Sequence, residues 1–161
     1  MELIPKPEPI FCKLKDLGLS WPVSSKGKAD LIIFDPPYFN KKAEEYHEKS
    51  ISGLSQEKYL EFLETFFDLV KQHAKKTTRL AFINADWRDF QNTAASEETG
   101  NGDILIDDYL DVLKRTGWQR SHIIQAPMSA QRFCAVVVSA MQKKRILGVT
   151  SRYVIIAKQY P

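Results

Sequence analysis

The sequence predicts an α/β fold, an open sheet joined by right-handed crossovers. Short runs rich in β-branched and aromatic residues alternate with longer segments of helical periodicity. The first run, at residues 29–34, is apolar at successive positions, as in a strand buried on both faces of a parallel sheet. The elements follow in the order strand, helix, strand, helix, strand, helix, strand. The last two strands are expected to pair antiparallel at one edge of a mostly parallel sheet.

The first half of the chain contains two of these strands and one helix. The first strand ends at Asp35, because the prolines that follow cannot donate to a ladder. Residues 39–54 are polar and predict a loop, in which Phe39 and Tyr46 either form a lid over a substrate or lie in an unstructured segment. Ser55 is the expected N-cap of a helix that runs to about residue 75. One face of that helix carries Leu60, Leu63, Phe67 and Val70. A second strand is predicted at residues 80–84.

The second half is predicted from similar signals. Residues 91–102 have the composition of a mobile loop. Asp103 is expected to cap a helix that Gly117 ends as the C′ residue. A strand is predicted at residues 120–126, a helix at 129–144 and a last strand at 152–158. The valines at positions 136–138 equally suit a strand.

Length and charge limit the class of protein. The 161 residues suit a single domain over 1–161, with a proline-rich extended segment at 1–9. The sequence has neither a membrane-length apolar run nor the features of a signal peptide, so we expect a cytoplasmic protein with no membrane partner. The two cysteines indicate no metal site and no disulfide framework.

The positive charge is concentrated near the end of the chain. Residues 112–161 carry nine of the 23 lysines and arginines and none of the 20 acidic residues. Such asymmetry indicates a surface that faces a polyanion. Arg132, Lys143, Lys144 and Arg145 are the candidate phosphate contacts. A solvated, basic helix end explains Lys143, Lys144 and Arg145 equally well.

The residues with a chemical signature are Asp35, Pro36, Pro37 and Tyr38, directly after the first strand. In an open α/β sheet, ligands bind at the carboxyl ends of strands. Two prolines stiffen the turn, so that it can hold a carboxylate, a carbonyl and an aromatic ring in fixed relation. Asp35 and the Pro36 carbonyl can each accept one N–H of an exocyclic amino group, while Tyr38 stacks on the base. A rigid turn without a catalytic role is the alternative interpretation.

The second strand ends at the same predicted edge. Asn84 and Trp87 belong to the segment that follows it. Trp87 either walls the base pocket or belongs to the core or its rim, and the second interpretation is the more common for tryptophan.

These residues resemble a family, the DPPY-motif amino-methyltransferases that modify adenine N6 or cytosine N4 in DNA. The resemblance rests on residues 31–40, and weaker similarity continues at 53–60, 79–87, 116–118, 122–124 and 152–158. It implies part of a Rossmann-like methyltransferase sheet and transfer of a methyl group from S-adenosylmethionine. It also implies catalytic roles for residues 35–38 and cofactor contacts at Phe34 and Asp35. DNA is the implied partner, and RNA is a less favoured one.

The sequence departs from this family at its second signature, a glycine-rich turn after a strand that holds the cofactor. No such turn follows an apolar run here. Three explanations remain open: the cofactor half lies on another chain or on a longer gene, the chain is a silent module that binds nucleic acid or completes another subunit, or the chain binds the cofactor in another way. A protein partner or a homo-oligomer would cover the missing half of the fold.

Overall fold

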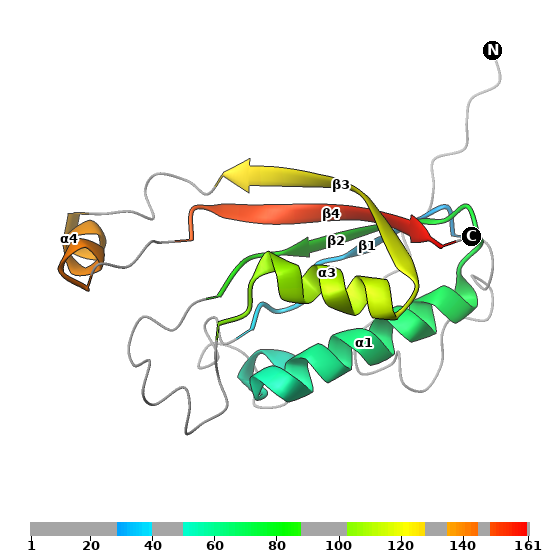
Figure 1. The fold of residues 1–161 in the computed structure, drawn as a ribbon, viewed down its shortest axis with the longest axis horizontal. Coiled ribbons are helices and arrows are strands. Elements are labelled where there is room, and N and C mark those ends of the chain that lie inside the picture. Colours follow the sequence, from blue (N-terminus) through cyan, green and yellow to red (C-terminus); the bar gives the residue numbers. More distant parts are fainter. Residues whose placement is uncertain (1–28, 40–49, 88–102, 128–134, 145–148, 161) are drawn as a thin grey trace, which may run out of the picture.

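The computed structural model describes residues 29–39, 50–87, 103–127, 135–144 and 149–160. Its elements are β1 (Leu31–Phe34), the 3-10 helix η3 (Ile51–Gly53), α1 (Gln56–His73), β2 (Arg79–Asn84), α3 (Ile106–Arg115), β3 (Trp118–Pro127), α4 (Ala135–Lys144) and β4 (Ser151–Gln159). This order confirms the predicted alternation of strands and helices (Figure 1). The predicted segments at 1–9 and 91–102, and the start of the helix predicted from residue 129, lie outside the described residues.

The four described strands form one sheet in the order β1-β2-β4-β3. β1 pairs parallel with β2, whereas β4 pairs antiparallel with both β2 and β3. Three strands therefore run in one direction and β4 alone runs against them. This confirms the α/β class and the antiparallel pairing of the last two strands. One consequence is positional: β1, β2 and β3 all end at the same edge of the sheet.

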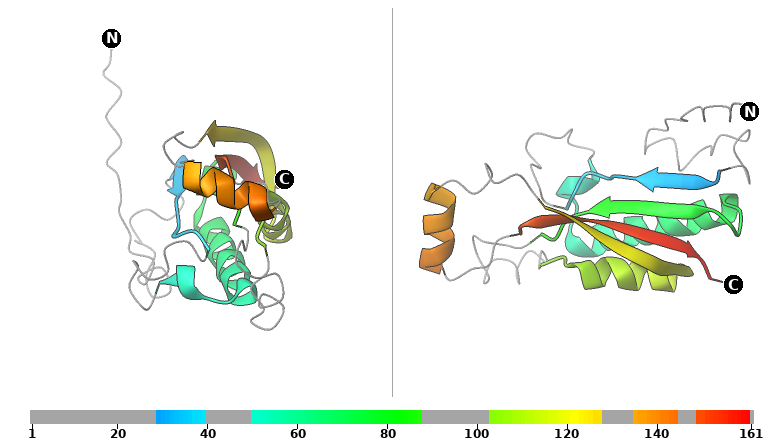
Figure 2. Two further views of the ribbon diagram at one scale, coloured as in Figure 1. Left: turned by 90° about the vertical axis from the view of Figure 1, so that its left-hand side faces the viewer. Right: turned by 90° about the horizontal axis from the view of Figure 1, so that it is seen from above.

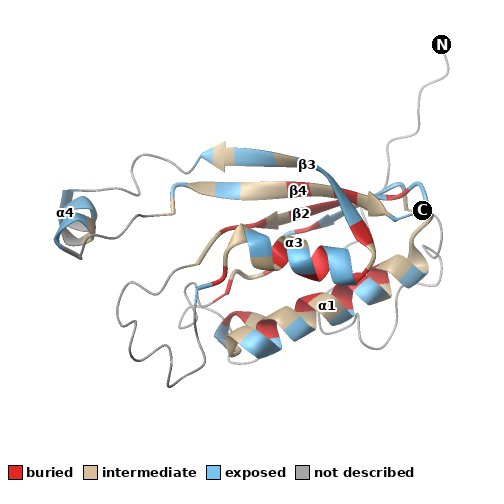
Figure 3. Cartoon of the chain, in the orientation of Figure 1, coloured by how far each residue is buried: buried red, intermediate tan, exposed pale blue. Residues whose placement is uncertain are grey.

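Both α1 and α3 cover one face of the sheet (Figures 1 and 2). The core lies between the sheet and these helices (Figure 3). The opposite face carries no described helix, and Leu31 and Ile33 on β1 remain 54% and 65% exposed. The side chains of β1 thus alternate between an enclosed and an open face, which differs from the expected burial on both faces. No helix in the described part of the chain is long and apolar enough to cross a membrane.

The helix ends show which local signals were sufficient. Ser55 caps α1, since its hydroxyl accepts the Lys58 amide at 3.4 Å, as predicted. Gly117 follows α3 with a φ of 76°, which agrees with its predicted C′ position. The prediction that Asp103 caps this helix is wrong. The helix begins two residues after Ile104, and the Asp108 carboxylate accepts the Leu105 amide at 2.8 Å.

Candidate active site at the carboxyl edge of the sheet

The turn of residues 35–38 lies at the carboxyl edge of the sheet, where β1 and β2 end side by side. The parallel register aligns Phe34 with Phe82, so the segment 84–87 leaves the sheet beside the turn. β3 ends and β4 begins at this same edge, and α4 lies beyond it (Figure 1). The ends of β1, β2 and β3, which are far apart in the sequence, therefore lie at one edge of the sheet. This placement was predicted for the turn and for residues 84–87.

The turn is attached to the helical layer by a hydrogen bond and by ring packing on its core side. The Tyr59 hydroxyl on α1 donates to the Pro37 carbonyl at 3.1 Å. Phe39 is fully buried, with its ring 5.4 Å from that of Tyr59 and edge-on to Trp87 at 5.0 Å. The suggestion that Phe39 forms a lid is therefore wrong, because its ring belongs to the core. Tyr46 lies outside the described residues.

The turn contains two hydrogen-bond acceptors, the Asp35 carboxylate and the Pro36 carbonyl. Asp35 is exposed and Pro36 is buried. Within the described part of the chain, neither the Asp35 carboxylate nor the Pro36 carbonyl has a hydrogen-bond partner. The Pro37 carbonyl, by contrast, is occupied by Tyr59. A carboxylate and a carbonyl that both lack donors suit a ligand with two N–H groups.

The Tyr38 ring is half-buried beside the turn and faces a cation. The Arg152 guanidinium, at the start of β4, lies 5.6 Å from the ring centroid. This is a cation–π arrangement. Sequence reasoning counted Arg152 only among the basic residues, since nothing local connects it to a ring 114 positions earlier. The arrangement brings one positive charge to the edge where β1 ends.

The segment after β2 contributes buried polar groups. Asn84 is 0% exposed, and neither of its amide atoms has a hydrogen-bond partner among the described residues. The Asp86 carboxylate accepts the Tyr153 hydroxyl at 3.3 Å. Trp87 is half-buried, packs on Phe39 and joins residue 104 through two backbone hydrogen bonds. Trp87 thus lies at the rim of the core, one of the positions expected for it, and the segment lies beside the turn.

Phe34 does not present its ring to this edge. The ring is 7% exposed and stacks on Phe66 at a centroid distance of 3.8 Å. It lies in the core with Phe67 and Phe82. A cofactor contact by Phe34 is thereby restricted to its backbone, and the cofactor contacts of Phe34 and Asp35 stay predictions.

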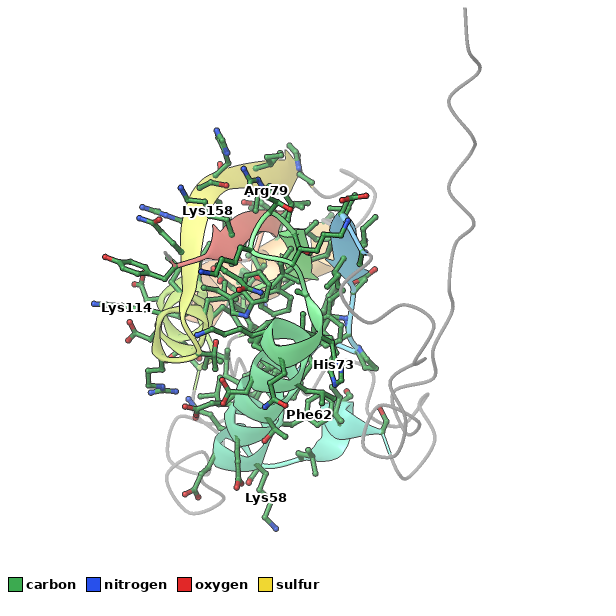
Figure 4. The ribbon with its side chains drawn as sticks, turned by 90° about the vertical axis from the view of Figure 1, so that its right-hand side faces the viewer. Lys58, Phe62, His73, Arg79, Lys114 and Lys158 are labelled. Atoms are coloured by element: carbon green, nitrogen blue, oxygen red, sulfur yellow. The ribbon has the colours of Figure 1, made fainter. Side chains whose placement is uncertain are left out.

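The predicted basic residues are described only in part. Lys143 is exposed on α4, whereas the side chain of Lys144 and all of Arg132 and Arg145 lie outside the described residues. The other cations do not share one surface. Lys114 and Lys158 lie at the end of the sheet away from the turn, with Arg79 of β2 (Figure 4). The cations of residues 112–161 are thus divided between both ends of the sheet.

Two buried tyrosines near the turn resist ionisation. Burial raises the pKa of Tyr59 and of Tyr109 far above the usual value. Nearby phenol and carboxyl groups, including Tyr38 and Asp86, raise the pKa values further. Both hydroxyls therefore stay protonated and able to donate over the whole neutral range.

This burial predicts a loss of stability at alkaline pH. A tyrosine in the unfolded chain ionises near its ordinary pKa of about 10, whereas Tyr59 and Tyr109 in the folded chain do not. The contribution of these protonated tyrosines to the free energy of unfolding is complete below about pH 10 and falls as the pH rises above that value. Urea midpoints measured from pH 8 to 11 should decline, and the decline should be shallower in Tyr59→Phe and Tyr109→Phe. Equal slopes in all three proteins would contradict the assignment.

Comparisons with known proteins identify the family and the fold. A sequence model of the N6/N4 methyltransferase family, described as DNA methylase, matches residues 29–145. None of the curated proteins matches the chain in sequence. The fold is similar to that of a provisionally assigned DNA modification methylase from Thermus thermophilus. In its selenomethionine form the TM-score is 0.54 at 13% identity, over 92% of this chain and 50% of that one. In its complex with S-adenosyl-L-methionine the TM-score is 0.56 at 12% identity, over 92% and 53%. The chain spans about half the length of these solved structures.

Proposed function

Because the chain belongs to the DNA methylase family, we propose that it carries the target-base half of an enzyme that methylates an exocyclic amino group in DNA, at adenine N6 or cytosine N4. One observation carries the proposal. Asp35 and the Pro36 carbonyl lack donors within the described residues, while the next carbonyl is held by Tyr59. An amino group has two N–H donors, which this pair of acceptors matches.

In this proposal, each residue of the turn has a separate task. The Asp35 carboxylate accepts one N–H and the Pro36 carbonyl accepts the other, which turns the nitrogen lone pair away from the protein. Pro37 fixes the backbone φ, and the Tyr38 ring stacks on a base flipped out of the duplex. The proton that leaves the nitrogen passes to a carboxylate oxygen of Asp35. S-Adenosylmethionine supplies the methyl group when bound.

The described residues fit the base better than the cofactor. The donor-free groups at the turn are oxygen acceptors, and the described glycines, Gly53 and Gly117, lie in helix-end positions. Neither glycine follows a strand, where a cofactor turn would be needed. We therefore propose that the methionine end of S-adenosylmethionine is held outside the described residues.

A second candidate function is that of a silent module that completes another methyltransferase subunit. The open face of β1, with Leu31 and Ile33 exposed, would suit such a protein partner or a second copy. In either case DNA is the expected polyanion, with RNA less favoured.

Calorimetric titration with S-adenosylmethionine and with its demethylated product tests the enzymatic proposal. Saturable binding at micromolar affinity or better would place a cofactor pocket on this chain. A methylation assay on duplexes that contain unmodified adenine or cytosine would then identify the base. Absence of binding would contradict activity of the chain alone and favour the function as a partner module.

Neutralising the basic residues near α4 tests the DNA contact. Replacement of Lys143, Lys144 and Arg145 by glutamine should weaken DNA binding. The slope of log K against log salt should become shallower by about 0.9 for each phosphate that the protein no longer neutralises. Fluorescence anisotropy at several salt concentrations measures this slope.

A matched control uses three cations at the other end of the sheet. Lys76, Arg79 and Lys114 are exposed, and their replacement by glutamine removes the same charge. We expect the control to retain the wild-type slope. An equal loss of DNA affinity and of salt slope in both triple variants would show that binding depends on net charge alone. That result would overturn the role of the α4 region.

A further inference from the structure

Two buried tyrosines join the helical layer to the two segments that leave the sheet beside each other. Tyr59 on α1 donates to the Pro37 carbonyl at 3.1 Å, after β1. Tyr109 on α3 donates to the Ala85 carbonyl at 3.2 Å, after β2. Both side chains are 0% exposed. The same kind of contact thus occurs twice, but only one of them reaches the turn with the acceptor pair.

The hydrogen bond from Tyr59 matters because the backbone of the turn has few hydrogen-bond donors of its own. Pro36 and Pro37 have no N–H groups and cannot bond to β2. The Tyr59 hydroxyl donates to the Pro37 carbonyl. It therefore holds the backbone immediately before Tyr38. The Phe39 ring, packed against the Tyr59 ring at 5.4 Å, adds an apolar contact at the same point.

α1 provides a firm base for this contact. Its 18 residues begin at the Ser55 cap, and its buried side chains Tyr59, Leu63, Phe66, Phe67 and Val70 pack into the core. A hydroxyl on such a helix has little freedom to follow a moving turn. In extended backbone, successive carbonyls point in different directions. When the Pro37 carbonyl is held toward the Tyr59 hydroxyl, the Pro36 carbonyl therefore points away from that hydroxyl.

We propose that Tyr59 is a positioning residue: its hydroxyl fixes the Pro37 carbonyl inward, so that the Pro36 carbonyl stays available to the target amino group. This inference rests on the proposed function of the turn. Tyr59 itself contacts no substrate and acts only through the backbone of the turn. Tyr109 makes the equivalent contact with the neighbouring segment and has no such effect on the Pro36 carbonyl.

The first test needs no ligand and compares Tyr59→Phe with the matched control Tyr109→Phe. Each variant removes one buried hydroxyl and keeps the ring. In the ligand-free chain, Tyr59→Phe should move the ¹³C carbonyl resonance of Pro37 and the ¹⁵N resonance of Tyr38, whose nitrogen belongs to the same peptide group. Tyr109→Phe should leave both signals at their wild-type values. Unchanged signals in Tyr59→Phe, or equal changes in both variants, would overturn the proposal.

The second test measures turnover on DNA with S-adenosylmethionine. A displaced turn should lower kcat by about ten- to a hundredfold in Tyr59→Phe, with KM for DNA within about twofold of wild type. Tyr109→Phe should keep the wild-type kcat. A wild-type kcat in Tyr59→Phe would overturn the positioning role. An inactive wild-type chain would contradict activity of the chain alone and not the positioning role, which the ligand-free signals would still decide.

Discussion

Asp35→Ala is expected to abolish methyl transfer and to leave DNA binding largely intact. The carboxylate is exposed and has no hydrogen-bond partner among the described residues, so its removal leaves no buried group unpaired. It would remove one of two acceptors for the amino group, and the loss of such a preorganised group costs about a hundred- to a thousandfold in kcat. Transfer of a radiolabelled methyl group to DNA, beside anisotropy at fixed salt, measures both effects.

The control for this variant is Asp30→Ala, at the other end of β1. Asp30 is exposed and pairs with Lys75 at 2.7 Å, a surface contact of small energetic value. The Asp30→Ala variant should keep both methyl-transfer activity and DNA binding. Methylation by Asp35→Ala at the wild-type rate would reject the catalytic role of the turn. Loss of DNA binding in Asp35→Ala alone would show that the carboxylate supports the bound state and not the reaction.

The fold could be predicted because its signals are local. Runs of β-branched residues ended at prolines or polar residues, and Ser55 and Gly117 marked helix ends. The prediction that Asp103 caps α3 was wrong for a local reason. Two carboxylates that can accept hydrogen bonds from backbone amides at the start of a helix, those of Asp103 and Asp108, lie close together in the sequence. The structure uses Asp108, which reaches back to the Leu105 amide at 2.8 Å. Composition alone does not choose between such neighbours.

The contacts of the candidate site could be predicted only in part. The turn and residues 84–87 were expected at one edge because strand direction places them there. Tyr59 was missed, although it precedes Leu63 by one helical turn and so shares its buried face. A buried tyrosine needs a partner for its hydroxyl, and that signal could have identified it. Arg152 depends on the pairing of β2 with β4, which no local pattern specifies.

The distribution of charge illustrates the same limit. The sequence placed nine cations in the last third of the chain, which suggested one basic surface. The reversal of β4 sends Lys158 to the end opposite the turn and leaves Arg152 beside Tyr38. Arg115 is engaged by Glu64 at 3.5 Å on the helical side. A linear count of charge therefore overstates the size of any one basic surface, because strand direction decides where each side chain lies.

Phe34→Ala should cost about 3–5 kcal/mol of the free energy of unfolding, which is a large part of the 5–15 kcal/mol of a typical domain. The ring stacks on Phe66 at 3.8 Å and contacts Phe67 and Phe82 at 6.0 and 5.7 Å. Among the described strands β1 pairs only with β2, so this ring is its main attachment to the helical layer. Urea denaturation followed by circular dichroism measures the change.

Two further variants separate the enclosed face of β1 from its open face. Phe34→Leu keeps most of the apolar volume and should lose less than half as much stability as Phe34→Ala. Ile33→Ala, on the next residue and the opposite face, should change the free energy of unfolding by no more than about 0.5 kcal/mol, because Ile33 is 65% exposed. If Ile33→Ala cost as much as Phe34→Ala, the open face would have to be covered in solution. The asymmetry between the enclosed and the open face of β1 would then be wrong.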